Sequence, residues 1–415
     1  MRQALPAALP LYLPRPLTVF ERSTFRRTWV YIMTTPILGR AVRHEWELDW
    51  DWLHVNHGSF GAAPRVVLAE QQYWRRRMEA APSWFMHHTL PEGLRTTLEH
   101  LGTFIGADAN DIAFVENATA GCNAVLRSLR ASPGDEVLVL AHGYQAVRNA
   151  VRYVTERAGA RMTKVVIPFP RPEPAEIVAC IGSALTPHTR VAVIDHITSQ
   201  SALVLPINDI VAVCHAAGVP VLIDGAHGPG QVPLDLRTIN ADWYVGNCHK
   251  WLCAPKGSGF LWAVPEQQAD LHPVIISHGF GNGFRAEFDW TGTGDRSSFL
   301  SVVAAIDFHH RLGGRTLMAR NVALAVEATS LLCQRLNTEP GSQGMMAAAM
   351  GVIRVPVGGH ASPDRVLELR DRLLSARADA PLHAINGGIW LRISAHAYNE
   401  IADYERLAEI IRAIC

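Results

Sequence analysis

Residues 219–227 read VPVLIDGAH and residues 241–250 read ADWYVGNCHK, and these two stretches decide the fold class. Each is a short apolar run that ends in small or polar residues, which is the pattern of a buried strand followed by a turn. Similar runs occur at 112–115, 136–140, 165–167, 190–195 and 259–263, with helical periodicity between them. We therefore predict an α/β fold with a mainly parallel sheet, whose ligand lies at the carboxyl ends of the strands.

The order of the predicted elements divides the chain into a large and a small domain. Residues 62–315 carry the alternating pattern, and residues 316–415 read as a smaller α+β C-terminal domain that begins with a long helix at 316–333 and has strands at 351–357 and 390–394. Residues 33–61 are predicted to join the small domain and the mouth of the site. Residues 1–32, rich in arginine and proline, are interpreted as an extension or an over-extended start before Met33, with a transit peptide as the alternative.

The composition indicates a protein that acts on small molecules. Lys+Arg and Asp+Glu both number 38, so no net charge favours nucleic acid or an anionic membrane as a partner. No apolar run reaches the roughly 18 residues that a membrane-spanning helix needs. The seven cysteines contain no C-x-x-C pair, which predicts reduced thiols in the cytoplasm and no metal site.

Lys250 is the first candidate for chemistry, because it follows an apolar strand and has apolar and aromatic neighbours. Burial disfavours a charged ammonium group and would provide the neutral amine that attacks a carbonyl carbon. A lysine after a strand is otherwise most often a surface residue.

Asp224 ends the strand of the first quoted stretch, and His227 follows three residues later. A carboxylate at a strand end can pair with the protonated ring nitrogen of a cofactor and keep that ring an electron sink. The alternative is an aspartate that caps the next helix. His227 could bond a cofactor oxygen, or it could be a core histidine.

Two further motifs suit anionic groups. At Asn117-Ala118-Thr119 a predicted strand ends and small residues begin a helix. The free backbone amides of a first helical turn can bind phosphate. The same pattern is also typical of a plain N-cap. Arg392 lies in a strand-like run, where a buried guanidinium needs an anion. Its planar fork fits a carboxylate, with a structural ion pair as the alternative.

Five motifs in this order resemble the class V aminotransferase family of fold-type I enzymes that use pyridoxal 5'-phosphate (PLP). They are NAT at 117–119, DGAH at 224–227, NCHK at 247–250, GT at 292–293 and LRIS at 391–394. Residues 55–61, 194–199 and 249–257 resemble the isopenicillin N epimerase-like branch of that family. The resemblance runs from about Leu38 to the C-terminus.

The resemblance implies catalytic roles around the PLP ring. Lys250 would form the Schiff base with PLP, Asp224 would pair with the pyridine nitrogen, and His227 would contact the phenolate side. The ring that stacks on the pyridine would come from Tyr144, which we prefer to His142 because residues 145–147 best match those after the family's stacking histidine.

The resemblance also implies a phosphate site shared between two subunits. Ala118, Thr119 and His249 would hold the phosphate, joined by Thr293 of the neighbouring subunit, which predicts a homodimer. Asn247 stands where relatives often carry serine, so no phosphate role is assigned to it.

On the substrate side, the resemblance implies that Arg392 binds the α-carboxylate, and that Asn56 and His57 line the same mouth. Relatives often read TGTRD where residues 291–295 read TGTGD. The arginine missing at Gly294 would anchor a distal carboxylate, which speaks against isopenicillin N itself as the substrate.

The predicted chemistry is removal of the Cα proton of an amino acid. An epimerase-like enzyme is the leading hypothesis, followed by a C–S lyase acting on a cysteine conjugate or sulfoxide, and by an aminotransferase. A cysteine desulfurase would need a mobile cysteine shortly before the carboxylate-binding strand, and residues 375–391 contain none. A non-catalytic PLP-fold ligand sensor is the least favoured reading.

Overall fold

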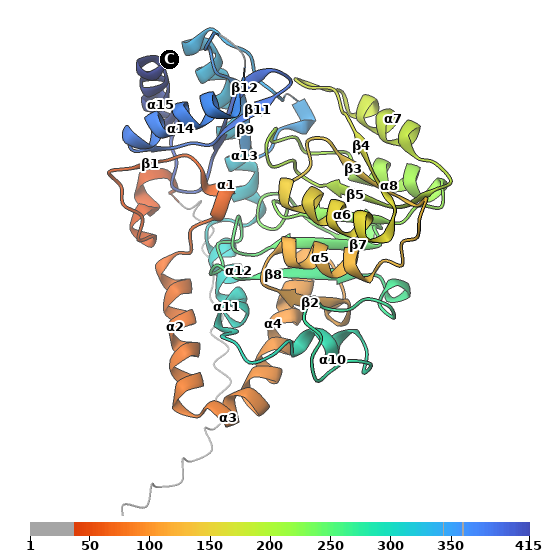
Figure 1. The fold of residues 1–415 in the computed structure, drawn as a ribbon. Helices are drawn as coiled ribbons and strands as arrows, with labels where there is room; N and C mark the ends of the chain where they lie inside the picture. The colour runs from red at the N-terminus through yellow and green to blue at the C-terminus, as the bar shows by residue number, and fades with distance from the viewer. Residues whose placement is uncertain (1–36, 343, 359–360) are drawn as a thin grey trace, which may run out of the picture. The chain divides into compact units, whose positions relative to one another are not determined.

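The computed structural model describes residues 37–342, 344–358 and 361–415, which form one compact unit (Figure 1). Residues 1–32, interpreted above as an extension, lie outside the described residues, as does the start of the predicted segment 33–61. Among the helices of this part, none is long and apolar enough to cross a membrane.

A seven-stranded sheet forms the centre of the larger part, in the order β2-β8-β7-β6-β5-β3-β4. Neighbouring strands are parallel except at β8, which is antiparallel to both β2 and β7. β8 follows β7 without a crossover helix, and a short connection can only return antiparallel. The predicted α/β fold with a mainly parallel sheet is confirmed. The strands are β2 (Ile112–Val115), β3 (Glu136–Leu140), β4 (Arg161–Val165), β5 (Thr189–Asp195), β6 (Val221–Gly225), β7 (Trp243–Asn247) and β8 (Gly259–Ala263).

The strand predicted at 165–167 is wrong in its bounds, because β4 ends at Val165 and Val166 is largely exposed. The charged residues Arg161 and Lys164 hid this strand from a search for apolar runs. β4 lies at the edge of the sheet and pairs only with β3, so charged side chains are tolerated on it.

Helices cover both faces of the sheet because successive strand residues point to opposite sides. In β3, Leu138 and Leu140 join the apolar cluster that includes α4 and α8, whereas Val137 and Val139 join the cluster with α5 and α6. The helices of this part are α2 (Arg65–Ala80), α3 (Pro82–Trp84), α4 (Leu90–Ile105), α5 (Ala118–Ser128), α6 (Gln145–Ala158), α7 (Pro174–Ala184), α8 (Ile207–Ala216), α9 (Leu236–Ile239), α10 (Phe284–Asp289), α11 (Ser297–Leu300) and α12 (Val302–Arg311). Shorter turns of helix lie at 39–45, 85–89, 109–111, 265–267 and 344–346.

The C-terminal elements surround a second, three-stranded antiparallel sheet with the order β11-β12-β9 and its own apolar cluster. The N-terminal stretch packs with these elements: β1 pairs with β10, and the Ser394 amide donates to the Val55 carbonyl at 2.7 Å. Figure 1 shows the first and last coloured parts of the chain side by side. The predicted boundary near residue 315 stays a prediction. The elements are β1 (Leu53–His54), α1 (His57–Phe60), α13 (Arg315–Leu336), β9 (Met350–Arg354), α14 (Pro363–Ser375), β10 (Ala378–Asp379), β11 (Leu382–Ile385), β12 (Gly388–Ser394) and α15 (Ile401–Ile414).

Candidate active site

A cavity of about 430 Å³ lies at the carboxyl ends of β5, β6 and β7, where open α/β sheets bind their ligands. It brings together seven of the residues predicted from sequence. They are Ala118, Thr119, Tyr144, Asp224, His227, His249 and Lys250.

Lys250 enters this cavity as a buried side chain whose Nζ lies 3.1 Å from Nε2 of His227. The Trp251 indole donates to Nδ1 of His227 at 3.3 Å. An indole N–H can only donate, so a neutral His227 carries its proton on Nε2, and the Lys250 nitrogen must accept it. An accepting amine is uncharged.

The electrostatics of the pair agree with this assignment. Burial lowers the pKa of Lys250 from its ordinary 10.5 to about 8, and the charge of Arg392 acts in the same direction. Burial also lowers the pKa of His227 well below its ordinary value, reinforced by Lys250 and Arg392. A pKa of about 8 leaves a larger share of the amine uncharged near neutral pH than in an ordinary lysine, and the uncharged form is the one that attacks a carbonyl carbon.

Two buried carboxyl groups lie side by side in the cavity. Asp224 is the last residue but one of β6, and its register partner Asp195 ends β5; both line the cavity and are 5% exposed. Burial raises the pKa of both, and for Asp195 the neighbouring Asp224 adds to the increase. Neither forms an ion pair with a basic side chain of the described residues, so the pair suits a cationic ligand atom. Asp195 was given no role from sequence, although an acid that ends the adjacent predicted strand was a usable signal.

The start of α5 also contributes to the cavity lining. Asn117 caps this helix by accepting from the Ala120 amide at 2.9 Å, so the plain N-cap reading holds as well. The Ala118 amide already donates to Oδ1 of Asn247 at 2.8 Å. The Thr119 amide lies in the first turn, where backbone donors lack helical partners, and both residues line the cavity.

His249 also lines the cavity, and its Nδ1 donates to the Ser258 carbonyl at 3.1 Å. Burial lowers the pKa of His249 to about 4, so the ring is neutral. A neutral ring with Nδ1 protonated leaves Nε2 without a proton. His249 could receive a hydrogen bond from a protonated phosphate oxygen, but it brings no positive charge.

Tyr144 and His142 take different positions. Tyr144 precedes α6 and lines the cavity. His142 is buried and packs edge-on against Phe169, with ring centroids 5.6 Å apart. The placement favours Tyr144 as the ring that stacks on a ligand.

Arg392 is fully buried on β12, yet no carboxylate of the described residues forms an ion pair with it. Its Nη1 donates to the Ser199 carbonyl at 2.6 Å, and its Nη2 donates to Oγ of Ser59 at 2.7 Å and to Oδ1 of Asn56 at 3.0 Å. Burial lowers the pKa of Arg392 to about 10. A buried guanidinium held by neutral oxygens is a site for an added anion. The sequence motifs contained Ser59 and Ser199, both of which line the cavity, but neither received a role.

Four predicted residues are not part of the cavity lining. One is Arg392, which instead donates hydrogen bonds to Ser59 and Ser199 of that lining; the others are Asn56, His57 and Thr293. Asn56 accepts a hydrogen bond from Arg392 and donates one to Asp379 at 2.9 Å. The ring of His57 does not face the cavity, because it bonds the Lys250 carbonyl and the Tyr398 hydroxyl. Thr293 is exposed. Its expected reach into a neighbouring subunit stays a prediction.

Together these groups fit PLP. An uncharged lysine suits the aldehyde, the start of a helix suits the phosphate, and the buried acids suit a protonated ring nitrogen. The guanidinium of Arg392, which has no ion-pair partner among the described residues, suits the carboxylate of an amino acid.

Comparison with known proteins gives the same assignment. The family model of aminotransferase class-V matches residues 56–407. The chain is 30% identical to an L-cysteine desulfhydrase of Arabidopsis thaliana, covering 88% of this chain and 90% of that protein. It is 32% identical to an isopenicillin N epimerase of Streptomyces clavuligerus, covering 88% and 96%.

Solved structures support the fold. A cystine C–S lyase shares 22% identity with a TM-score of 0.72, over 87% of this chain and 97% of that one. A cysteine desulfurase of Escherichia coli shares 18% identity with a TM-score of 0.74, over 91% and 99%. This chain therefore belongs to the class V aminotransferase family, as an enzyme with the fold-type I architecture whose cofactor is PLP.

Proposed function

We propose that this enzyme removes the Cα proton of a small cysteine-like amino acid, with Lys250 as the base, and eliminates the sulfur group from Cβ. The observation that carries the proposal is the combination of a neutral amine in the cavity with a buried, unpaired guanidinium that is bonded to Ser59 and Ser199 of the cavity lining. One base and one carboxylate anchor are sufficient for β-elimination from a short amino acid.

The chain's own residues supply binding and proton transfer. Bound PLP supplies an aldehyde that condenses with amines and a ring that withdraws electrons from Cα. Arg392 binds the α-carboxylate and thereby places Cα near the amine of Lys250. The lowered pKa of Lys250, about 8, lets that amine accept a proton near neutral pH.

Asp224 and His227 would hold protons that keep PLP reactive. The Asp224 carboxylate would retain the proton of the ring nitrogen. The Nε2–H of His227 would donate to an oxygen of PLP once Lys250 no longer accepts it. Tyr144 would cover one face of the ring.

The lining of the cavity favours elimination over epimerisation of isopenicillin N. The lining contains the acids Glu116, Asp195 and Asp224, of which Glu116 is ion-paired with Arg296 at 3.1 Å, and no arginine is among the described lining residues. A distal carboxylate on the substrate would meet the unpaired acids Asp195 and Asp224, whereas cysteine has no such group. For this reason we propose a C–S lyase ahead of the epimerase, which led on sequence alone.

Epimerisation is the second candidate, because Tyr144 places a second proton-bearing group at the same cavity as Lys250. Sulfur transfer to an enzyme thiol is not proposed. Among the described residues that line the cavity there is no cysteine, and burial raises the pKa of Cys122, Cys248 and Cys253.

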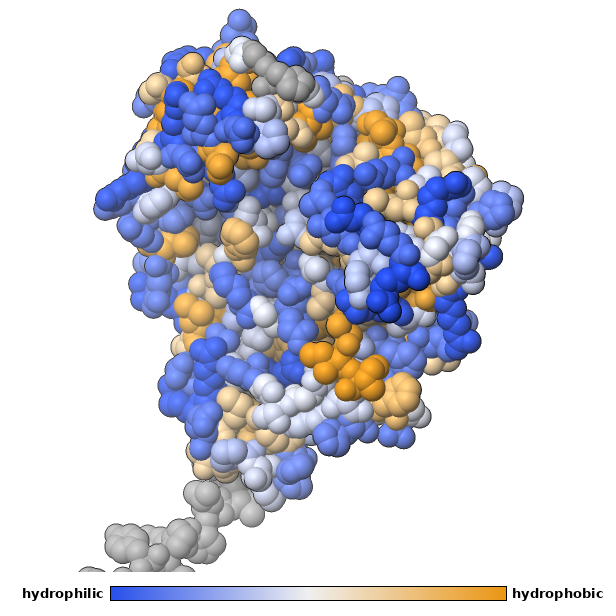
Figure 2. Space-filling view, viewed as in Figure 1, coloured by the Kyte–Doolittle hydropathy of each residue, from blue (hydrophilic) through white to orange (hydrophobic). Residues whose placement is uncertain are grey.

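The enzyme is also proposed to act as a homodimer in which Thr293 completes the neighbouring site. Val274, Ile275, Ile276 and Phe280 are exposed apolar side chains, and a second pocket is lined by Val274, Ile275 and Thr291. Figure 2 shows a hydrophobic patch near α10. Such surfaces are typical of protein interfaces. Sedimentation velocity tests this, and a monomer at working concentration would contradict it.

Incubation of the PLP-loaded enzyme with L-cysteine in deuterated water separates the candidate reactions. Elimination yields pyruvate, sulfide and ammonia in equal amounts. Deuterium at Cα with inverted configuration and no pyruvate would replace the lyase proposal by an epimerase. Neither exchange nor product with any amino acid would refute Cα-proton removal.

A further inference from the structure

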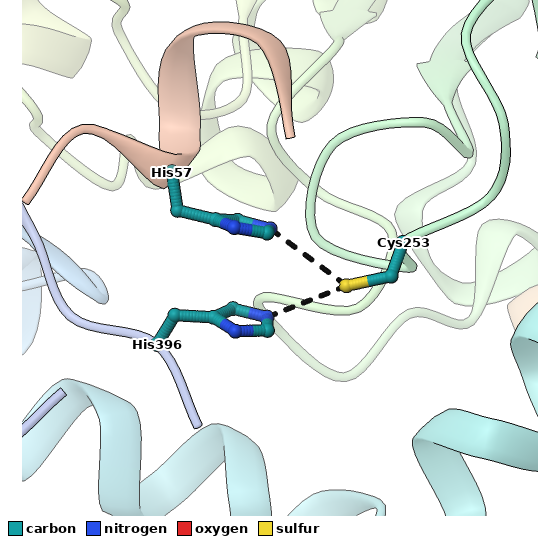
Figure 3. Close-up of side chains that lie close together, drawn as sticks. All are labelled: His57, Cys253 and His396. Atoms are coloured by element: carbon teal, nitrogen blue, oxygen red, sulfur yellow. Dashed lines mark hydrogen bonds between the residues drawn. The ribbon is translucent and has the colours of Figure 1, made fainter. Parts of the chain in front are cut away.

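His57, Cys253 and His396 form a buried cluster (Figure 3) that is not part of the cavity lining. The two imidazole rings stack with centroids 3.7 Å apart and planes 15° apart. Cys253 Sγ lies 3.8 Å from Nε2 of His57 and 3.5 Å from Nε2 of His396. None of these side chains has a part in the chemistry described above.

The cluster resembles a metal site in composition but not in geometry. The three ligand atoms lie within 4.8 Å of one another. A metal ion binds in the plane of an imidazole ring, and two rings stacked face to face cannot both direct their planes at one ion. In addition, Nε2 of His57 is engaged with the Lys250 carbonyl at 3.0 Å.

That contact fixes the protonation of His57. A carbonyl oxygen only accepts, so Nε2 of His57 donates, and the neutral ring accepts at Nδ1 from the Tyr398 hydroxyl at 2.9 Å. Burial lowers the pKa of His57 to about 3, so the ring stays neutral at ordinary pH. The Cys253 amide donates to the same carbonyl at 3.1 Å. The backbone of Lys250 is thus held by two donors, one of them 193 positions away in the sequence.

His57 belongs to the short helix α1, which also supports Arg392. Ser59 of this helix and Asn56, which directly precedes it, accept from the Arg392 guanidinium. At the other end of α1, a Cβ at Gly61 would lie 1.9 Å from the His249 carbonyl oxygen, so the helix packs directly on the backbone beside Lys250. One helix therefore touches both groups that handle the substrate.

We propose that His57 is a positioning residue, which holds the Lys250 carbonyl so that the amine points into the cavity at a fixed distance from Arg392. This rests on the proposed function, because it assigns His57 to the delivery of the lysine. Ser59 performs the matching task for the guanidinium. We therefore expect substitutions at His57 and at Ser59 to change different kinetic constants.

The first test measures how fast the apoenzyme attaches PLP covalently to Lys250, followed by absorbance. His57→Ala slows attachment about tenfold or more and lowers kcat by a similar factor, since loss of a supporting hydrogen bond misplaces the reacting atom. KM changes less than about threefold. Ser59→Ala does the reverse: it raises KM about tenfold and leaves the attachment rate unchanged.

Conservative variants separate positioning from general damage to the fold. Glutamine carries an amide N–H at about the position of Nε2, whereas asparagine is too short, so His57→Gln should recover most of the attachment rate and His57→Asn should not. His309→Ala is the matched control, because His309 is also buried and its Nε2 bonds the Gly230 carbonyl at 3.3 Å. It should leave the attachment rate unchanged.

Several outcomes would overturn the assignment. Attachment at the native rate in His57→Ala, or equal rates for His57→Gln and His57→Asn, would remove the positioning role. Stoichiometric zinc in the native protein that is lost in Cys253→Ala would make the cluster a metal site instead. If the unaltered protein fails to attach PLP at Lys250, the proposed function itself fails.

Discussion

Replacing Arg392 by methionine should remove the anchor for the substrate carboxylate while preserving the volume of the side chain. The guanidinium is fully buried, and its bonds go to the neutral oxygens of Asn56, Ser59 and Ser199. Because no carboxylate of the described residues forms an ion pair with it, the substrate would supply the missing anion.

The expected loss follows from the bonds that a carboxylate would form. Two charge-assisted hydrogen bonds contribute about 1.5–3 kcal/mol each, so their loss corresponds to about 3–4 kcal/mol after the variant rebinds water. The value of kcat/KM for L-cysteine should therefore fall by about 10²–10³-fold. Arg392→Lys keeps a point charge without the planar fork, so its kcat/KM should lie between those of the native enzyme and Arg392→Met.

The assay compares ligands with and without a carboxylate. L-Alanine and ethylamine both present an amine to bound PLP, and absorbance reports the dissociation constant of each. Arg392→Met should raise the dissociation constant of L-alanine by about 10²-fold or more and that of ethylamine by less than about threefold. Equal weakening of both ligands would refute the assignment of Arg392 to the carboxylate.

Three further predictions concern the lysine, its acid partner and the packing of α1. The rate at which PLP attaches to the apoenzyme should rise with pH and level off above about pH 8, because burial lowers the pKa of Lys250 to about 8. A stopped-flow pH series with a midpoint near the ordinary lysine pKa of 10.5 would contradict this. Asp224→Asn should still attach PLP but lose about 10²-fold or more in kcat, since the ring nitrogen loses its proton partner; full turnover in a pyruvate assay would exclude the role. Gly61→Ala should destabilise the protein by about 2 kcal/mol or more in urea unfolding, because Gly61 has φ 68° and its Cβ would meet the His249 carbonyl oxygen at 1.9 Å. Gly134→Ala is the control, with φ 93° but nothing within 4 Å, so it should cost only the backbone strain.

The sequence predicted those parts of the fold that depend on local pattern. Apolar runs of four to six residues gave most strands of the large sheet, and the long helix expected at 316–333 is α13. The antiparallel direction of β8 and the true bounds of β4 were not predictable in this way. Both depend on which strand lies next to which, and the pattern of a single segment does not contain that information.

The site divides along the same line. Lys250, Asp224 and Thr119 could be selected because each follows or ends a strand, and the carboxyl ends of parallel strands meet at one edge of a sheet. The pairing of Asp195 with Asp224 was missed because each acid alone resembles an ordinary strand end. It became evident only from the register of β5 and β6.

The sequence by itself determined the fold class, the family and the lysine proposed to bind PLP, because residues within a few positions of one another carry those signals. Only the tertiary structure decided that His57 faces the Lys250 backbone instead of the cavity, and that Ser59 holds Arg392 from 333 positions away. Those contacts join segments whose separation along the chain is large, and the direction of a side chain there is set by packing against the partner segment, not by its sequence neighbours.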